Sequence, residues 1–127
     1  MKADVIILAR GGSKGIPKKN LKIFCGKPLV EWTIIQAKNS KKVDQVFLSS
    51  DSTKILKIGN KHKIRLIRRP RKFASDNSSS ESAIRHVLKS NSNISKKAIV
   101  YLEPTSPLRK KGDIDELIKN FFKKKWD

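Results

Sequence analysis

A loop rich in glycine and cations follows the first apolar run of the chain. Residues 10–20 read Arg-Gly-Gly-Ser-Lys-Gly-Ile-Pro-Lys-Lys-Asn, directly after the β-branched run 5–9. Glycines let backbone N–H groups approach a phosphate, and Arg10, Lys14 and Lys19 carry charge that would neutralise a triphosphate during phosphoryl transfer. The loop has the spacing neither of a P-loop nor of the dinucleotide-binding fingerprint. It predicts phosphate binding of another kind, and a solvated basic turn is the alternative.

Arg69 and Glu103 come close to the ends of two later apolar runs. Arg69 follows the run 64–67, and its planar guanidinium can donate to the acceptor edge of a nucleobase. An exposed charge at a strand end is the alternative for Arg69. Glu103 follows the run 98–102, and an ionised glutamate only accepts hydrogen bonds, so it can bind sugar hydroxyls.

Four short apolar runs alternate with segments of helical periodicity. Strands are predicted at 5–9, 46–48, 64–67 and 98–102, and helices are predicted to begin near residues 28, 52, 78 and 112. This alternation predicts a parallel sheet with right-handed crossovers in an open, doubly wound α/β fold. If the strand order is third, second, first, fourth, the loops after the first and fourth strands flank the crevice at the carboxyl edge, where such folds bind ligands.

Several other side chains are expected to have structural roles. Ser78 and Glu81 match a capping box, so Ser78 and Ser80 are explained first by the start of a helix. Asp51 or Ser52 is expected to cap a helix, with Asp51 favoured, and Cys25 is expected to be a small buried apolar residue. The clearest amphipathic stripe, which should pack on the sheet, comprises Ile114, Leu117, Ile118, Phe121 and Phe122.

Composition limits the class of protein. The 127 residues, of which 37% are hydrophobic, are typical of one globular domain. Thirty Lys+Arg against eleven Asp+Glu give a formal charge of +19, which favours phosphates, nucleotides, nucleic acid or anionic membranes as partners. The cations are spread along the chain without an arginine-rich arm, so no specific nucleic-acid partner is expected. The single cysteine and the absence of a long apolar stretch predict a cytoplasmic protein without a membrane partner.

Six polar segments occur in one order along the whole chain. They are residues 8–21, 26–29, 49–51, 69–70, 76–80 and 104–109, the last followed by Asp113-Ile114. Together they resemble the CMP-sialic acid synthetase family, the acylneuraminate cytidylyltransferases. Members of that family join a nonulosonic acid such as N-acetylneuraminate to CTP and release pyrophosphate, on a nucleotide-diphosphosugar-transferase, Rossmann-like α/β fold with Mg²⁺ as cofactor. The resemblance implies a CTP-dependent nucleotidyltransferase.

The resemblance also implies a set of site residues. Arg10, Lys14 and Lys19 would be the catalytic cations, with the two lysines along the phosphates. Glu103 would bind the sugar, although it stands where members usually have glutamine, and a carboxylate would repel the acidic sugar unless cations offset it. The nucleotide-binding residues would be Arg10, Gly12, Ser13, Asn20, Arg69, Ser78 and Ser80.

The resemblance covers the N-terminal part of the family's domain. Residues 1–127 are expected to be the N-terminal nucleotide-binding part of a cytidylyltransferase domain, since the chain stops just past the last predicted helix and looks truncated. The family's remaining part brings more of the sheet, a dimerisation segment, an arginine needed for activity and the carboxylates that bind Mg²⁺. Magnesium ligands are therefore expected beyond residue 127. The implied partners are CTP and an acidic sugar, and the homodimer of full-length members is not extended to this chain.

Two alternatives remain open. Within the same chemistry, the acceptor could be 3-deoxy-manno-octulosonate, legionaminate or pseudaminate. In another class, the chain would be a non-catalytic basic module that binds nucleotides or nucleic acid, with the steep salt dependence that its charge implies. A shift in thermal stability that CTP causes and GTP does not would favour the enzyme family.

Overall fold

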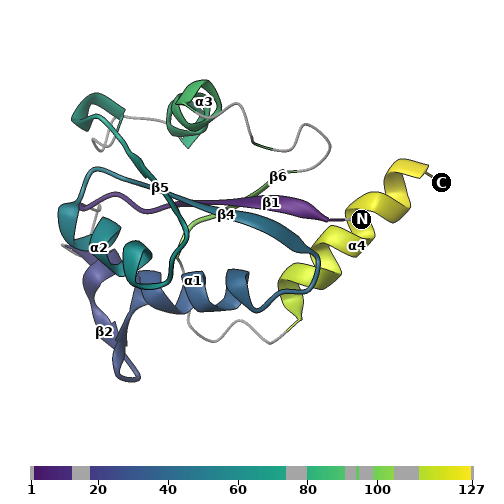
Figure 1. The fold of residues 1–127 in the computed structure, drawn as a ribbon, viewed down its shortest axis with the longest axis horizontal. Coiled ribbons are helices and arrows are strands. Elements are labelled where there is room, and N and C mark those ends of the chain that lie inside the picture. The colour runs from purple at the N-terminus through teal and green to yellow at the C-terminus, as the bar shows by residue number, and fades with distance from the viewer. Residues whose placement is uncertain are drawn as a thin grey trace.

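Four parallel strands form the central sheet of the computed structural model, which describes residues 2–12, 18–73, 80–90, 94, 99–104 and 112–126. The strands lie in the order β5-β4-β1-β6 (Figure 1). This confirms the predicted order of third, second, first and fourth strand. Their bounds are β1 (Ala3–Leu8), β4 (Val43–Ser50), β5 (Arg65–Arg68) and β6 (Ile99–Leu102).

Helices cover both faces of this sheet (Figure 1). Val5 and Ile7 of β1 pack in a cluster with one group of helices, whereas Ile6 and Leu8 pack in a second cluster on the other face. Since successive side chains of a strand point to opposite faces, one central strand serves both clusters. The fold is doubly wound, as predicted. The first face carries α1 (Leu29–Lys38), α2 (Thr53–Lys61) and α4 (Asp113–Trp126), and the second carries α3 (Ser80–Ser90).

Gly59 lets α2 lie close to the sheet. A Cβ atom built at this glycine would come within 2.6 Å of Cδ2 of both Leu48 and Leu66. Real Cβ atoms do not approach carbon atoms so closely, so a larger residue at this position would require the Leu48 and Leu66 side chains to move. The short distances bring the C-terminal part of α2 against β4 and β5.

A small hairpin that the sequence did not predict precedes α1. It consists of β2 (Ile23–Phe24) and β3 (Lys27–Pro28), which pair antiparallel. Cys25 and Gly26 form its two-residue turn with φ of 49° and 85°, as the tight turns of hairpins require. Cys25 is exposed at this turn, so the prediction that it is buried was wrong.

Helix α4 packs on the sheet with only part of its predicted stripe. Ile114 and Ile118 are buried in the first cluster, and Phe122 packs against it. Leu117 is 54% exposed, so its predicted burial was wrong. At 3.6 residues per turn Leu117 lies about 100° from Ile118 around the helix, on the flank that faces away from the sheet. The Phe121 side chain lies outside the described residues.

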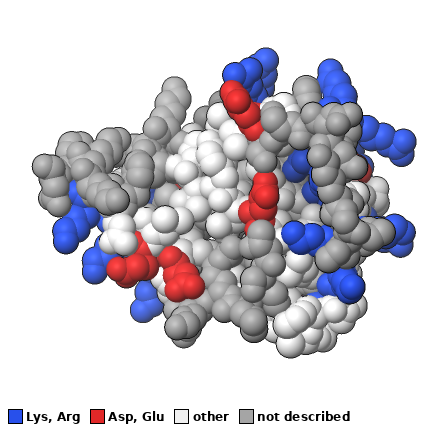
Figure 2. Space-filling view, turned by 180° about the vertical axis from the view of Figure 1, so that it is seen from behind, with Lys and Arg blue, Asp and Glu red and all other residues white. Residues whose placement is uncertain are grey.

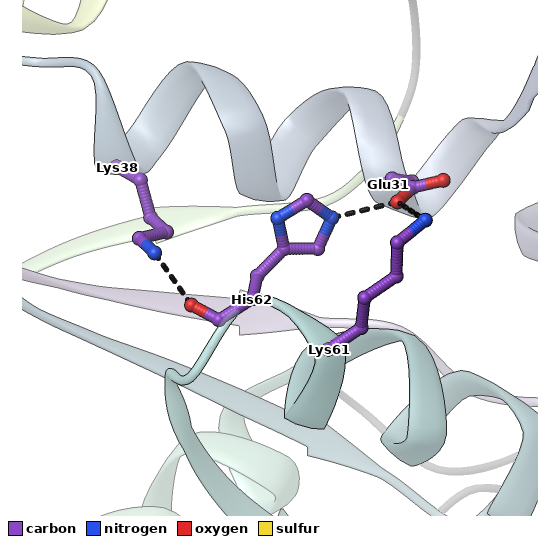
Figure 3. A network of polar contacts seen from close by, with 4 residues as sticks. All are labelled: Glu31, Lys38, Lys61 and His62. Carbon is purple, nitrogen blue, oxygen red and sulfur yellow. Dashed lines mark hydrogen bonds and ion pairs between the residues drawn. The ribbon is translucent and has the colours of Figure 1, made fainter.

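A buried carboxylate joins α1 to the end of α2 (Figure 3). Glu31 is buried, and its Oε2 accepts hydrogen bonds from Lys61 Nζ at 3.0 Å and from His62 Nε2 at 2.6 Å. Burial raises the pKa of Glu31, but the hydrogen bonds and charges of His62 and Lys61 lower it by more, so the net pKa lies below its usual value. Lys38 adds a hydrogen bond from its ammonium group to the backbone oxygen of His62. This network fixes the two helices to each other on one face of the sheet.

Candidate functional site

Charged residues follow all four strands at the carboxyl edge of the sheet. Arg10 comes after β1, Asp51 after β4, Arg69 after β5 and Glu103 after β6. Parallel strands end at the same edge, and the charges of Asp51, Arg10 and Glu103 all act on the pKa of Arg69. The structure thus brings together three of the predicted site residues. Asp51, which the sequence did not predict as a site residue, lies with them.

Arg69 is buried at this edge. It is 5% exposed, and its Nε donates to Ser49 Oγ while its Nη2 donates to the Ser49 backbone oxygen, both at 3.1 Å. The alternative of an exposed charge at a strand end was therefore wrong. Burial lowers the pKa of Arg69, the charges of Asp51 and Glu103 raise it, and that of Arg10 lowers it. An arginine side chain nevertheless stays protonated at neutral pH, so a desolvated positive charge is held here.

Residues 49–52, which we call the serine segment, hold this edge together. Ser49 and Ser50 are completely buried. The backbone oxygen of Ser49 accepts from Ala9 N at 3.0 Å, and that of Ser50 accepts from Arg69 N at 2.8 Å. The serine segment therefore links the loop after β1 to the loop after β5. Ser49 and Ser50 are the last two residues of β4, and the sequence did not predict this role for them.

Asp51 contacts the loop after β1 instead of capping α2. Its Oδ1 accepts a hydrogen bond from Gly11 N at 2.7 Å. The cap of α2 is Ser52, whose Oγ accepts from Ile55 N at 3.3 Å. Of the two predicted caps, Ser52 is confirmed. The prediction for Asp51 was wrong because it lies one residue too early, and its carboxylate extends across the edge to the neighbouring loop.

The described ends of the glycine-rich loop lie against each other. Asn20 is buried in the short 3₁₀ helix Lys19–Leu21, and its Nδ2 donates to the backbone oxygen of Arg10 at 2.9 Å. Arg10 and Lys19 are half-buried, and Gly12 is exposed. The structure gives Asn20 a contact that shapes the loop, while its role toward a nucleotide stays a prediction.

Four predictions rest on residues that the structure does not describe in full. Ser13, Lys14 and Ser78 lie outside the described residues. Ser80 is the first residue of α3, but its side chain also lies outside them. The capping box of Ser78 with Glu81 is likewise outside the description.

The described acidic and histidine side chains do not form a metal centre. Among the residues that the structure describes, no three His, Cys, Asp or Glu side chains come together in a way that could hold a metal ion. These residues therefore do not fit a resident Mg²⁺. Magnesium ligands beyond residue 127 stay a prediction, and no step below involves a metal.

The cations on one face of the molecule do not gather in one patch. Figure 2 shows the side opposite to that of Figure 1, where Lys and Arg side chains lie at separate places around the outline with Asp and Glu among them. On that face, the described residues lack the continuous basic surface that typically follows a nucleic-acid backbone. Within the same described parts of the chain, no helix has both the length and the apolar character to cross a membrane.

A comparison with protein families decides the family. The family model described as Cytidylyltransferase matches residues 5–127, which is nearly the whole chain. The chain belongs to the cytidylyltransferase family. This confirms the resemblance seen in the polar segments, and it places the glycine-rich loop and the carboxyl edge within a known family of nucleotidyltransferases.

Relatives of this cytidylyltransferase chain carry names for two kinds of acidic sugar. An N-acylneuraminate cytidylyltransferase of Oncorhynchus mykiss is 38% identical over 102 residues, which cover 80% of this chain and 23% of the relative. A pseudaminic acid cytidylyltransferase of Campylobacter jejuni (serotype O:23/36, strain 81-176) is 35% identical over 125 residues, which cover 95% of this chain and 53% of the relative. The chain thus spans about half or less of the length of these relatives.

Solved structures share the fold. CMP:2-keto-3-deoxy-manno-octonic acid synthetase in complex with CTP matches 97% of this chain and 48% of its own, with a TM-score of 0.78 and 21% identity. A cytidylyltransferase of Leptospira borgpetersenii matches 96% of this chain and 49% of its own, with a TM-score of 0.72 and 23% identity. The predicted nucleotidyltransferase fold is confirmed over the part that the chain covers.

Proposed function

We propose that residues 1–127 are the N-terminal, nucleotide-binding part of an enzyme that transfers CMP from CTP to a nonulosonic acid and releases pyrophosphate. The observation that carries this proposal is the meeting of Arg10, Arg69 and Glu103 at the carboxyl edge, next to the glycine-rich loop. Ligands of open parallel sheets bind at this edge. The family supplies the reaction class, and the charges at the edge suit a nucleoside triphosphate.

The reaction needs positive charge at the phosphates more than it needs a protein nucleophile. A hydroxyl oxygen of the sugar attacks the α-phosphorus, the new O–P bond forms, the bond to the bridging oxygen of pyrophosphate breaks, and the hydroxyl proton is released to solvent. Negative charge grows on the non-bridging oxygens and on the leaving group. Arg10, Lys14 and Lys19, with amides of the glycine-rich loop, would stabilise that charge.

The nucleotide would be held by donors around the same edge. Arg69 would donate to the acceptor edge of cytosine, because its buried guanidinium has a fixed direction and is poorly solvated. Further contacts would come from the other nucleotide-binding residues that the resemblance implies, which are Gly12, Ser13, Asn20, Ser78 and Ser80.

The acceptor would be an acidic sugar held in part by Glu103. The relatives named for N-acylneuraminate and for pseudaminic acid support this class, and 3-deoxy-manno-octulosonate and legionaminate belong to the same class. Replacing Glu103 by glutamine in a full-length protein should keep CTP affinity and change the KM for the sugar. The proposal also includes a location in the cytoplasm and Mg²⁺ as cofactor, and it does not extend the homodimer of full-length members to this chain.

Calorimetric titration with CTP and GTP tests the nucleotide site. We expect CTP to bind and GTP to bind at least about tenfold more weakly, because Arg69 would pair with cytosine. Arg10→Ala should remove CTP binding and leave the melting temperature of the free protein unchanged. A duplex oligonucleotide that binds with a steep salt dependence, while CTP gives no heat, would favour the basic binding module instead.

A further inference from the structure

We propose that Asp51 is a positioning residue that sets the glycine-rich loop for phosphate binding. The inference rests on the proposed nucleotide site and assigns a role at that site to a residue outside the predicted set. Asp51 would act through the peptide between Arg10 and Gly11, without contacting the nucleotide itself.

The peptide between Arg10 and Gly11 is held from both sides. Its N–H, which belongs to Gly11, donates to Asp51 Oδ1 at 2.7 Å. Its oxygen, which belongs to Arg10, accepts from Asn20 Nδ2 at 2.9 Å. Two side chains therefore fix the orientation of one peptide plane, and with it the direction in which the chain leaves β1 toward Gly12.

Asp51 is itself held in place, so the loop is the partner that it orients. The backbone oxygen of Asp51 accepts from Arg68 Nη1 at 3.0 Å. On either side, Ser52 N donates to Ser50 Oγ at 3.1 Å, and Ser52 caps α2. The carboxylate is thus anchored to a strand end and a helix start, and an N–H group that donates to a carboxylate makes one of the stronger hydrogen bonds of a protein.

Gly11 also lies against the serine segment. A Cβ atom at Gly11 would come within 3.1 Å of Ser52 Cβ, whereas one at Gly12 would meet nothing within 4 Å among the residues that the structure describes. Since Asp51 already takes the Gly11 N–H, the amide of Gly12 is the first one of the loop that can donate to a phosphate. The described start of the loop is therefore held at Gly11, while Gly12 is exposed.

The two properties of the Asp51 carboxylate, its acceptor oxygen and its charge, have opposite effects on an anionic ligand. The acceptor oxygen holds Gly11, which favours binding, while the negative charge near the phosphates disfavours it. Asp51→Asn keeps an acceptor oxygen and removes the charge. Asp51→Ala removes both. A positioning role thus predicts a loss in Asp51→Ala that Asp51→Asn restores.

The test compares these two variants with wild type by NMR titration, which detects weak binding. We expect Asp51→Ala to weaken CTP binding about tenfold and to change cytidine binding less than about twofold, because only CTP carries phosphates. Asp51→Asn should bind CTP within about threefold of wild type. Asp44→Ala, which removes an exposed carboxylate at the other end of β4, is the matched control and should bind both ligands as wild type does.

Each outcome supports or overturns the inference. Unchanged CTP binding in Asp51→Ala, or an equal loss for CTP and cytidine, would overturn it. If wild type binds no CTP, the proposed function fails. Hydrogen exchange of the Gly11 amide then tests separately whether Asp51 holds the loop. Hydrogen exchange of that amide should become faster in Asp51→Ala and stay slow in Asp51→Asn, and equal exchange in all variants would overturn the inference. If Asp51→Ala does not fold, a loss of CTP binding beyond tenfold in folded Asp51→Asn overturns it.

Discussion

Glu31 and Arg69 are both buried charges, yet the fold treats them in opposite ways. Burial disfavours the ionised form of each. At Glu31, the hydrogen bonds and charges of His62 and Lys61 outweigh burial, and the pKa falls below its usual value. At Arg69, burial outweighs the charges of Asp51 and Glu103, and the pKa also falls, which for a base means that the charged form is disfavoured.

This difference separates a structural charge from a functional one. A fold gains stability from a buried ion whose partners outweigh its desolvation, as between α1 and α2. A buried cation that its surroundings do not favour costs stability, and such residues concentrate at binding and catalytic sites. A cytosine base would give Arg69 further acceptors besides those of Ser49, so ligand binding would offset the cost of burying it.

The largest effect is expected when Arg69 loses its charge. Arg69→Met should weaken CTP binding at least about 100-fold, because charged hydrogen bonds to the base disappear. The free energy of unfolding should change by less than about 1 kcal/mol, since a long apolar side chain removes the cost of desolvation. Calorimetry and urea unfolding measure the two quantities.

Arg65→Met is the matched control for this variant. Arg65 is an exposed arginine at the other end of β5, so its loss should leave CTP binding unchanged. If Arg69→Met lowered the free energy of unfolding as much as Glu31→Ala and the folded variant kept CTP affinity, Arg69 would be a structural charge like Glu31, and the contrast between the two residues would be wrong.

Removal of Glu31 should act on stability alone. Glu31→Ala takes away a buried carboxylate that accepts from two side chains and should lower the free energy of unfolding by about 2 kcal/mol. Lys61 is 69% exposed, so its share of this loss is small. Glu81→Ala, which breaks an exposed pair with Arg85, should cost less than about 0.5 kcal/mol. Reduced CTP affinity in folded Glu31→Ala would contradict the assignment of a purely structural role to Glu31.

The strands and their order were predictable because the alternation of short apolar runs with helical segments is compatible with few folds. A buried β-branched run such as residues 5–9 is typical of a central parallel strand, and short alternating elements allow few topologies. The two-residue strands of the hairpin around Cys25 were missed, since such short strands carry no alternation. Pro28 there suggested the first turn of a helix, whereas it lies in β3 just before α1.

The contacts that define the edge were not predictable. Asp51 lies 40 residues from Gly11 along the chain. From the local sequence alone, an acidic residue just before a helix is interpreted as a helix cap, and a contact with a distant loop cannot be predicted. The contact between Glu31 and His62 could not be predicted for the same reason, since the two residues are 31 positions apart in the sequence. The resemblance identified Arg69, yet the buried serines that hold it emerged only from the structure.

A smaller effect is expected from protonation of Glu31. Its pKa is lowered in the folded state, so its contribution is fully present above the unfolded pKa of about 4.3 and is lost as pH falls through the lower folded value. The difference in free energy of unfolding between wild type and Glu31→Gln should be constant near neutral pH and shrink below about pH 4. Urea unfolding between about pH 3 and 7 measures this difference. A difference that grows on acidification would mean that the neutral form is the stabilised one.

The smallest effect is expected from substitutions of two neighbouring glycines at the carboxyl edge. Gly11→Ala places a Cβ atom 3.1 Å from Ser52 Cβ, so the loop must move by a few tenths of an ångström and lengthen its bond to Asp51. We expect a loss of about 0.5 to 1 kcal/mol in the free energy of unfolding, since the crowding and the weakened bond outweigh the lower entropy of the unfolded chain.

Gly12→Ala is the matched control for stability, because its Cβ atom meets none of the described residues within 4 Å. Gly12 does not have a left-handed backbone conformation, so alanine can replace it without strain. Alanine also lowers the entropy of the unfolded chain, which should raise the free energy of unfolding by up to about 1 kcal/mol. Urea unfolding should therefore show a lower free energy of unfolding for Gly11→Ala and a higher one for Gly12→Ala than for wild type. Equal shifts would mean that Gly11 is not crowded by the serine segment, and that the Asp51 bond contributes nothing measurable to this edge. A loss in Gly11→Ala as large as that in Glu31→Ala would instead mean that the carboxyl edge supports the fold as strongly as the contact between α1 and α2 does.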